Sequence, residues 1–112
     1  PVFSALVKDW GFPGPDEQPE FWRQLSLARN ADRVTAPLLI QTSDAELRVS
    51  LEAFDAFQRK GRPIEMIVYP DEYHNKWQPA HLKAMYETSI DWFGFWLRQV
   101  TPRDAGRALR WS

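Results

Sequence analysis

Three polar side chains are the clearest candidates for acid–base chemistry: the carboxylates of Asp44 and Glu46 and the imidazole of His74. The two carboxylates follow the apolar run of residues 37–41, and the histidine follows the β-prone run of residues 64–69. Both runs are typical of buried strands, so acid and base are expected on loops at two strand ends. A carboxylate that orients a proton-transferring histidine makes up two of the three groups of a Ser-His-acid triad.

The third group of such a triad, a nucleophilic serine, has no candidate in the chain. In α/β hydrolases this serine lies in a Gly-x-Ser-x-Gly turn and precedes the acid and the histidine. The motif is absent, and the serines present lie outside any such turn: Ser4, Ser26, Ser43, Ser50, Ser89 and Ser112. The order of acid and then histidine therefore predicts the C-terminal portion of an α/β hydrolase, incomplete on its own. Alone, this portion is expected to be inactive.

The elements that must position these side chains form a strand, helix, strand, helix series. Ser50 is a candidate N-cap for the first helix, and Gly61 suits the position just after its end. Apolar residues at helical spacing predict a second, amphipathic helix that begins near Pro79 and ends before Pro102. A strand–helix–strand unit of this length implies parallel strands joined by a right-handed crossover. Two strands alone would be poorly covered, which indicates that the chain belongs to a larger domain.

Three segments are expected along the chain. Residues 1–35 are loop-rich, with a short helix near residues 21–27, residues 36–101 hold the strand and helix series, and residues 102–112 form a basic, loosely held tail. The last helix contains an aromatic cluster, for which core packing is a better explanation than a binding site. Its expected core-facing residues are Phe93, Trp96 and Leu97.

Other side chains near the histidine have simpler interpretations. Trp77 lies on the same loop as His74 and is a candidate substrate-binding residue. The second histidine, His81, falls in the first turn of the last helix, where we expect it to be solvated. Asp71 and Glu72 are too close to His74 in sequence to form a good three-ligand site, so no metal is predicted.

Composition narrows the classes of partner. Aromatic residues make up 14% of the 112 residues, which argues against disorder. The net charge is -1 and no apolar run approaches the roughly 20 residues of a membrane span, so we expect neither nucleic acid nor membrane as a partner. The chain has no cysteine, which leaves the compartment open. It starts at Pro1 without methionine, so we expect sequence upstream, and the localisation stays unknown.

Several pieces, in this order, resemble the end of the prolyl oligopeptidase family. They are Ala36-Pro37-Leu38-Leu39-Ile40, Arg48-Val49, Phe57-Gln58-Arg59-Lys60-Gly61, Val68-Tyr69-Pro70, His74 and Asp91-Trp92-Phe93. The resemblance covers about residues 30–100. It implies a C-terminal α/β-hydrolase domain behind a β-propeller and a peptide substrate. The upstream part of the same hydrolase would be the partner, and no cofactor is implied.

The chain also departs from the family pattern. Gln41-Thr42 stands where the family commonly has His-Gly, and Tyr73 and Asn75 replace glycines on either side of the histidine. The histidine loop, residues 70–74, followed by Trp77-Gln78-Pro79, resembles the lasso-peptide isopeptidase branch. That branch opens the macrolactam amide of a threaded peptide.

The same resemblance bears on the choice of acid. If the chain is aligned on Arg48-Val49, Glu46 takes the place of the family's catalytic aspartate. If it is aligned on the strand end, Asp44 comes closer. We favour Glu46 and keep Asp44 as the alternative. Either carboxylate could instead cap the following helix.

The leading hypothesis is a serine hydrolase of peptide or isopeptide amide bonds, to which this chain supplies the acid and the histidine. One alternative is a non-catalytic α/β-hydrolase-like interaction module, which the lost glycines around His74 would fit. Another is an ester hydrolase, since the fold does not determine the acyl substrate.

Overall fold

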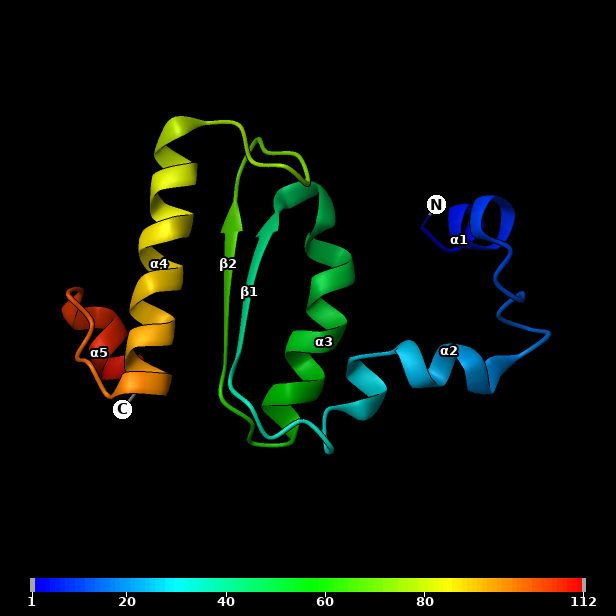
Figure 1. Cartoon of the computed structure of the whole chain (residues 1–112), viewed down its shortest axis with the longest axis horizontal. Helices are drawn as coiled ribbons and strands as arrows, with labels where there is room; N and C mark the ends of the chain where they lie inside the picture. Colours follow the sequence, from blue (N-terminus) through cyan, green and yellow to red (C-terminus); the bar gives the residue numbers. More distant parts are fainter. Residues whose placement is uncertain (1, 112) are drawn as a thin grey trace.

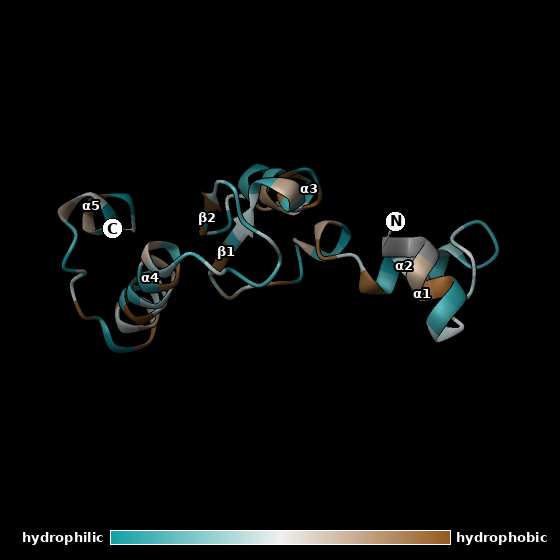
Figure 2. Cartoon of the chain, turned by 90° about the horizontal axis from the view of Figure 1, so that it is seen from above, coloured by the Kyte–Doolittle hydropathy of each residue, from teal (hydrophilic) through white to brown (hydrophobic). Residues whose placement is uncertain are grey.

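The core of the fold is a two-stranded parallel sheet with a helix on each face. The computed structural model describes residues 2–111, and the side chains of residues 5–111. Strand β1 (Leu38–Ser43) leads through the 3-10 turn η2 (Asp44–Glu46) into helix α3 (Leu47–Arg59), which returns the chain to strand β2 (Ile64–Tyr69). Figure 2 shows α3 and helix α4 (Pro79–Arg98) on opposite sides of the strands. The predicted parallel strand–helix–strand unit is confirmed.

The register of the sheet determines which loops meet. Leu38 pairs with Ile64 at one end of the sheet, and Ser43 pairs with Tyr69 at the other. Because both strands run in the same direction and end on the same residue pair, the loops that follow them leave the sheet side by side. Both loops lie at the upper end of the sheet in Figure 1.

Helix α3 begins earlier than the sequence predicts. Ser50 is not its N-cap but lies inside the helix, where its hydroxyl donates to Thr42 Oγ1 (3.0 Å) and to the Glu46 carbonyl (3.3 Å). The turn η2 already has helical geometry, so the helix continues from it without a side-chain cap. At the other end Gly61 has a φ of 62°, the left-handed conformation expected just after a helix.

Helix α4 begins at Pro79, as predicted, but it buries a different face from the one expected. Trp92 is 4% exposed, whereas Phe93 is 58% and Leu97 75% exposed, so within this chain these two do not face the core as predicted. The apolar residues of α4 extend around more of the helix than one neighbour can cover, and Trp92 lies on the side that packs against Trp96 and Trp111. We call the exposed apolar side chains of α4 the α4 stripe: Tyr86, Ile90, Phe93 and Leu97.

The C-terminal residues form a packed helix rather than the loosely held tail that the sequence predicts. In helix α5 (Ala105–Trp111) the side chain of Trp111 is buried against Trp92, with ring centroids 5.0 Å apart. Arg107 binds the carboxylate of Asp91 at 2.8 Å, and the Trp111 indole donates to Glu65 on β2. Two basic residues of the segment, Arg107 and Arg110, are thus partners of the carboxylates of Asp91 on α4 and Glu65 on β2.

The N-terminal segment carries two helices, α1 (Val2–Trp10) and α2 (Pro19–Leu25), and a short 3-10 turn, η1 (Ala28–Asn30). Figure 1 shows these helices to one side of the sheet, beyond α3. The rings of Phe12, Phe21 and Trp22 contact one another, and the Trp22 indole donates to the Pro13 carbonyl at 2.8 Å. Within the described residues, no helix combines the length and apolarity needed to cross a membrane.

Candidate active site

The candidate site lies at the carboxyl ends of the two strands, where the loops after β1 and β2 meet. The first loop is η2, and the second, which we call the histidine loop, covers residues 70–78. In open α/β sheets this edge is where ligands bind, because loops from adjacent parallel strands converge there. The two loops supply all the candidate residues predicted from the sequence.

The imidazole of His74 contacts the carboxylate of Glu46. The distance from Nδ1 to Oε1 is 2.7 Å, which is within the range of a strong hydrogen bond. The other carboxylate oxygen of Glu46 accepts a hydrogen bond from the hydroxyl of Ser43 at 3.1 Å, and Ser43 is fully buried at the end of β1. A fixed donor beneath the carboxylate and the imidazole beside it leave Glu46 few orientations.

The electrostatics of this pair favour an ionised acid. The hydrogen bond from His74 lowers the pKa of Glu46, and it outweighs the desolvation that would raise this pKa. The hydroxyl of Ser43 and the charge of Lys76 act in the same direction. The His74 side chain is 85% exposed, and none of the described residues forms a hydrogen bond with its Nε2 atom. That nitrogen is therefore accessible to a reacting group.

Asp44, the alternative acid, does not contact His74. Its carboxylate accepts hydrogen bonds from the backbone N–H groups of Ala45 (3.0 Å), Asp71 (3.0 Å) and Glu72 (3.5 Å). The N–H of Asp71 is the main cause of the lowered pKa of Asp44. Because Asp44 directly follows β1, its side chain reaches the backbone of the neighbouring loop at Asp71 and Glu72. The imidazole of His74 therefore contacts Glu46 instead.

Glu72 is a residue of the site that sequence reasoning missed. Its side chain is buried, and its oxygens accept hydrogen bonds from the backbone N–H groups of Trp77 (2.9 Å) and Gln78 (3.1 Å). His81 Nδ1 is 2.8 Å from the same carboxylate, so the prediction that His81 is solvated is wrong. The carboxylate faces inward and covers the N-terminal turn of α4. The only sequence signal was a glutamate two residues before a histidine, which is too common to be specific.

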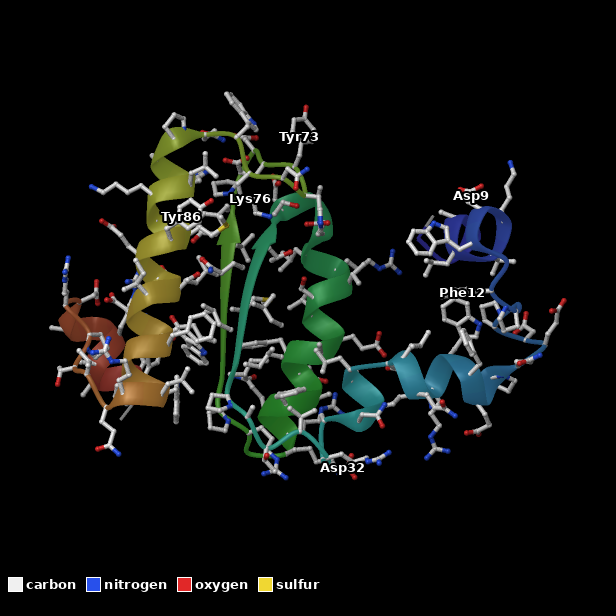
Figure 3. The ribbon with its side chains drawn as sticks, in the orientation of Figure 1. Asp9, Phe12, Asp32, Tyr73, Lys76 and Tyr86 are labelled. Carbon is white, nitrogen blue, oxygen red and sulfur yellow. The ribbon has the colours of Figure 1, made fainter. Side chains whose placement is uncertain are left out.

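Two aromatic side chains flank His74 on the exposed side of its loop. Tyr73 is 74% exposed and Trp77 is 61% exposed. Figure 3 shows Tyr73 and Lys76 at the loop end of the sheet, with Tyr73 directed away from the strands. The ammonium of Lys76 donates to the His74 carbonyl at 3.0 Å. Trp77 is therefore an exposed aromatic side chain on the loop that carries His74.

No group of three or more metal-ligating side chains comes together among the described residues. Glu72 uses its oxygens on Trp77, Gln78 and His81.

Residues 3–100 match the sequence profile of the prolyl oligopeptidase family. Over 116 aligned residues the chain is 42% identical to the lasso peptide isopeptidase AtxE2 of Asticcacaulis excentricus, and the match covers 99% of this chain. The chain is also 28% identical over 105 residues to dipeptidyl-peptidase 5 of Porphyromonas gingivalis, and this match covers 81% of the chain. The matches span only 16% and 15% of the lengths of those two relatives.

Solved structures agree with the sequence matches. The chain superposes on a serine-to-alanine variant of AtxE2 with Astexin3-dC4 bound, with a TM-score of 0.84 and 40% identity. That match covers 99% of this chain and 18% of the solved one. The ligand-free AtxE2 structure matches with a TM-score of 0.77 and 42% identity, over 88% of this chain and 15% of the solved one. The parallel strands and flanking helices are therefore similar to those of the corresponding segment of AtxE2.

Proposed function

This chain belongs to the prolyl oligopeptidase family, and from that premise we propose that it supplies the acid and the base of a serine peptidase acting on peptide or isopeptide amide bonds. The base is His74 and the acid is Glu46. The nucleophilic serine and the donors that stabilise the oxyanion come from residues outside this chain. The observation that carries the proposal is the 2.7 Å contact between His74 Nδ1 and Glu46 Oε1.

The proposed reaction uses the two nitrogens of His74 for different tasks. Glu46 accepts a hydrogen bond from the Nδ1–H of His74, which leaves the free lone pair on Nε2, the exposed nitrogen. The serine hydroxyl gives its proton to Nε2 while its oxygen bonds to the amide carbonyl carbon. His74 then gives that proton to the departing amine nitrogen as the C–N bond breaks. Water hydrolyses the acyl-enzyme by the same route, and Glu46 stabilises the imidazolium in both halves.

The identity to AtxE2 supports an isopeptide amide as the bond that is cleaved. At 42% identity over nearly the whole chain, the histidine loop with its exposed Trp77 is part of the matched region. An exposed aromatic side chain on the loop that carries the proposed base offers a surface for the backbone or side chains of a peptide. We propose Trp77 as a substrate contact.

The proposed partner is the remainder of the same hydrolase, including an upstream β-propeller. The α4 stripe exposes four large apolar side chains at helical spacing along α4. Parallel sheets are normally covered on both faces and extended by further strands. We propose that the stripe and the outer edges of β1 and β2 pack against the part of the α/β-hydrolase domain that carries the serine.

Replacement of the proposed base tests this function. In the full-length hydrolase, His74→Ala should lower kcat by on the order of 10³ or more, as loss of a triad member does. The assay follows opening of a threaded lasso peptide by mass spectrometry, as the gain of one water, with a linear peptide amide for comparison. Lys83→Ala, an exposed change on α4, is the control and should retain wild-type activity.

Activity of folded His74→Ala within tenfold of the wild type would overturn the assignment. An interaction module or an esterase would give different results in the same assay. A module would show no hydrolysis even in the wild type. An esterase would cleave activated esters and leave both amide substrates intact.

A further inference from the structure

His74 is held in place almost entirely by its neighbours along the chain. Its side chain is 85% exposed, so core packing does not restrict the imidazole. Its only side-chain hydrogen bond among the described residues is the one to Glu46. A base that must reach a serine within a few tenths of an ångström therefore depends on the loop that carries it.

A single buried carboxylate holds that loop from inside. Glu72 precedes His74 by two residues, and its donors all follow the histidine: the N–H groups of Trp77 and Gln78 and the imidazole of His81. The hydrogen bonds therefore close the loop around His74. They also connect it to α4, since Gln78 is the N-cap residue of that helix and His81 lies in its first turn.

The loop after β1, which carries Asp44 and Glu46 and which we call the acid loop, binds the other end of the histidine loop. Asp44 accepts the N–H groups of Asp71 and Glu72, just before His74, and Asp44 itself lies two residues before Glu46. Asp71 has a φ of 52°, a left-handed conformation that aspartate tolerates better than most non-glycine residues. The histidine loop is thus tied to the acid loop before His74 and to α4 after it.

From this arrangement we infer that Glu72, together with His81, is a positioning pair for His74. The inference rests on the function proposed above, in which His74 is the catalytic base. Glu72 and His81 touch neither substrate nor reacting atoms; they act through the loop geometry that aims Nε2 at the serine. The ring of His81 contacts the ring of Tyr69, with centroids 5.3 Å apart. Since Tyr69 is the last residue of β2, the Glu72–His81 pair packs against the end of that strand.

The chemistry of Glu72 suits this task. Burial of an unpaired carboxylate is costly, and here three donors offset that cost. Desolvation would raise the pKa of Glu72, but the N–H groups of Trp77 and Gln78 and the imidazole of His81 together hold it below its ordinary value. The carboxylate is therefore ionised at neutral pH and accepts from all three donors at once. A neutral amide in its place would present an N–H₂ group to at least one of them.

The test compares two glutamates at opposite ends of β2 in the full-length hydrolase. Glu72→Gln should lower kcat by roughly 10- to 100-fold with KM within about twofold, because a misplacement of about 1 Å costs on the order of 10². Glu65→Gln is the matched control. Glu65 is also largely buried, and it binds Arg110 and Trp111 far from the loop. The Glu65→Gln variant should lose thermal stability and retain the kcat of the wild type.

A second measurement does not depend on the peptide. The rate at which a fluorophosphonate labels the active serine also needs the aimed base, so it should fall in Glu72→Gln in parallel with kcat. A purely structural role would lower Tm in both glutamate variants and leave kcat and the labelling rate unchanged. That result would overturn the inference.

Replacements of His81 keep the inference testable if Glu72→Gln does not fold. His81→Asn retains an N–H near the position of Nδ1 and should keep most of the activity, whereas His81→Leu removes the donor and should lose it. Equal activity of the two would refute the pairing. If His74→Ala is inactive while Glu72→Gln equals the wild type, only this inference fails. If His74→Ala is active, the proposed function itself fails.

Discussion

The choice between Glu46 and Asp44 is the sharpest quantitative consequence of the site. Glu46 Oε1 lies 2.7 Å from His74 Nδ1, whereas the oxygens of Asp44 bind the backbone of Asp71 and Glu72. Glu46→Gln keeps the size of the side chain, but it removes the charge and can present an N–H₂ group to Nδ1. The imidazole then loses the partner that sets its tautomer.

The expected magnitude follows from what is removed. Loss of the acid in a Ser-His-acid triad costs on the order of 10⁴ in kcat when the wrong tautomer results. Glu46 is 37% exposed, so solvent can replace part of its interaction, and we expect a loss of about 10² to 10⁴. At 1.36 kcal/mol per decade, this corresponds to about 3–5 kcal/mol of transition-state stabilisation. Glu46→Asp withdraws the carboxylate by about one C–C bond, near 1.5 Å, so the contact would lengthen to roughly 4 Å.

The assay is steady-state amide hydrolysis by the full-length hydrolase, with kcat and KM determined separately. Glu46→Gln should lower kcat with little change in KM, and Glu46→Asp should be intermediate. Asp44→Asn should mainly lower Tm, because it weakens the link between the two loops. A larger fall in kcat for Asp44→Asn than for Glu46→Gln would refute the reasoning.

Two further predictions concern stability. The pKa of Glu72 is lowered in the folded state, so its stabilising contribution is fully present above its unfolded value of about 4.5 and is lost as pH falls through the lower folded value. Thermal melts should therefore show that Tm decreases as the pH is lowered below about 4.5, and that it decreases less steeply in Glu72→Gln. Identical dependence of Tm on pH in the two proteins would contradict this prediction. Because the α4 stripe is exposed, this chain expressed alone should aggregate, or it should bind hydrophobic dyes and lack a near-UV circular dichroism signal. In the full-length hydrolase Leu97→Lys should lower Tm by several degrees, while Lys83→Ala should not; no effect of Leu97→Lys would show that the stripe is solvent-exposed.

The sequence by itself determined the central series of strand, helix, strand and helix and the positions of the two loops. Residues 64–69 form a strand with the predicted bounds, Pro79 begins α4, and Gly61 has the positive φ expected after a helix. These features depend on local causes. The apolar character of a strand, the fixed φ of proline and the freedom of glycine all act within a few residues of where they occur. The order of acid and histidine at two strand ends was visible for the same reason.

Only the tertiary structure decided which side chains meet. Ser43 and Tyr69 end the parallel strands as one pair, and this register brings Glu46 and His74 together across 28 residues of sequence. The partners of Glu72 and His81 depend on how the loop folds back on α4, for which no periodicity exists. The buried face of α4 and the docking of α5 likewise depend on which neighbours are present. Such contacts join residues far apart in the chain, so their geometry follows from the assembled sheet and helices rather than from local sequence.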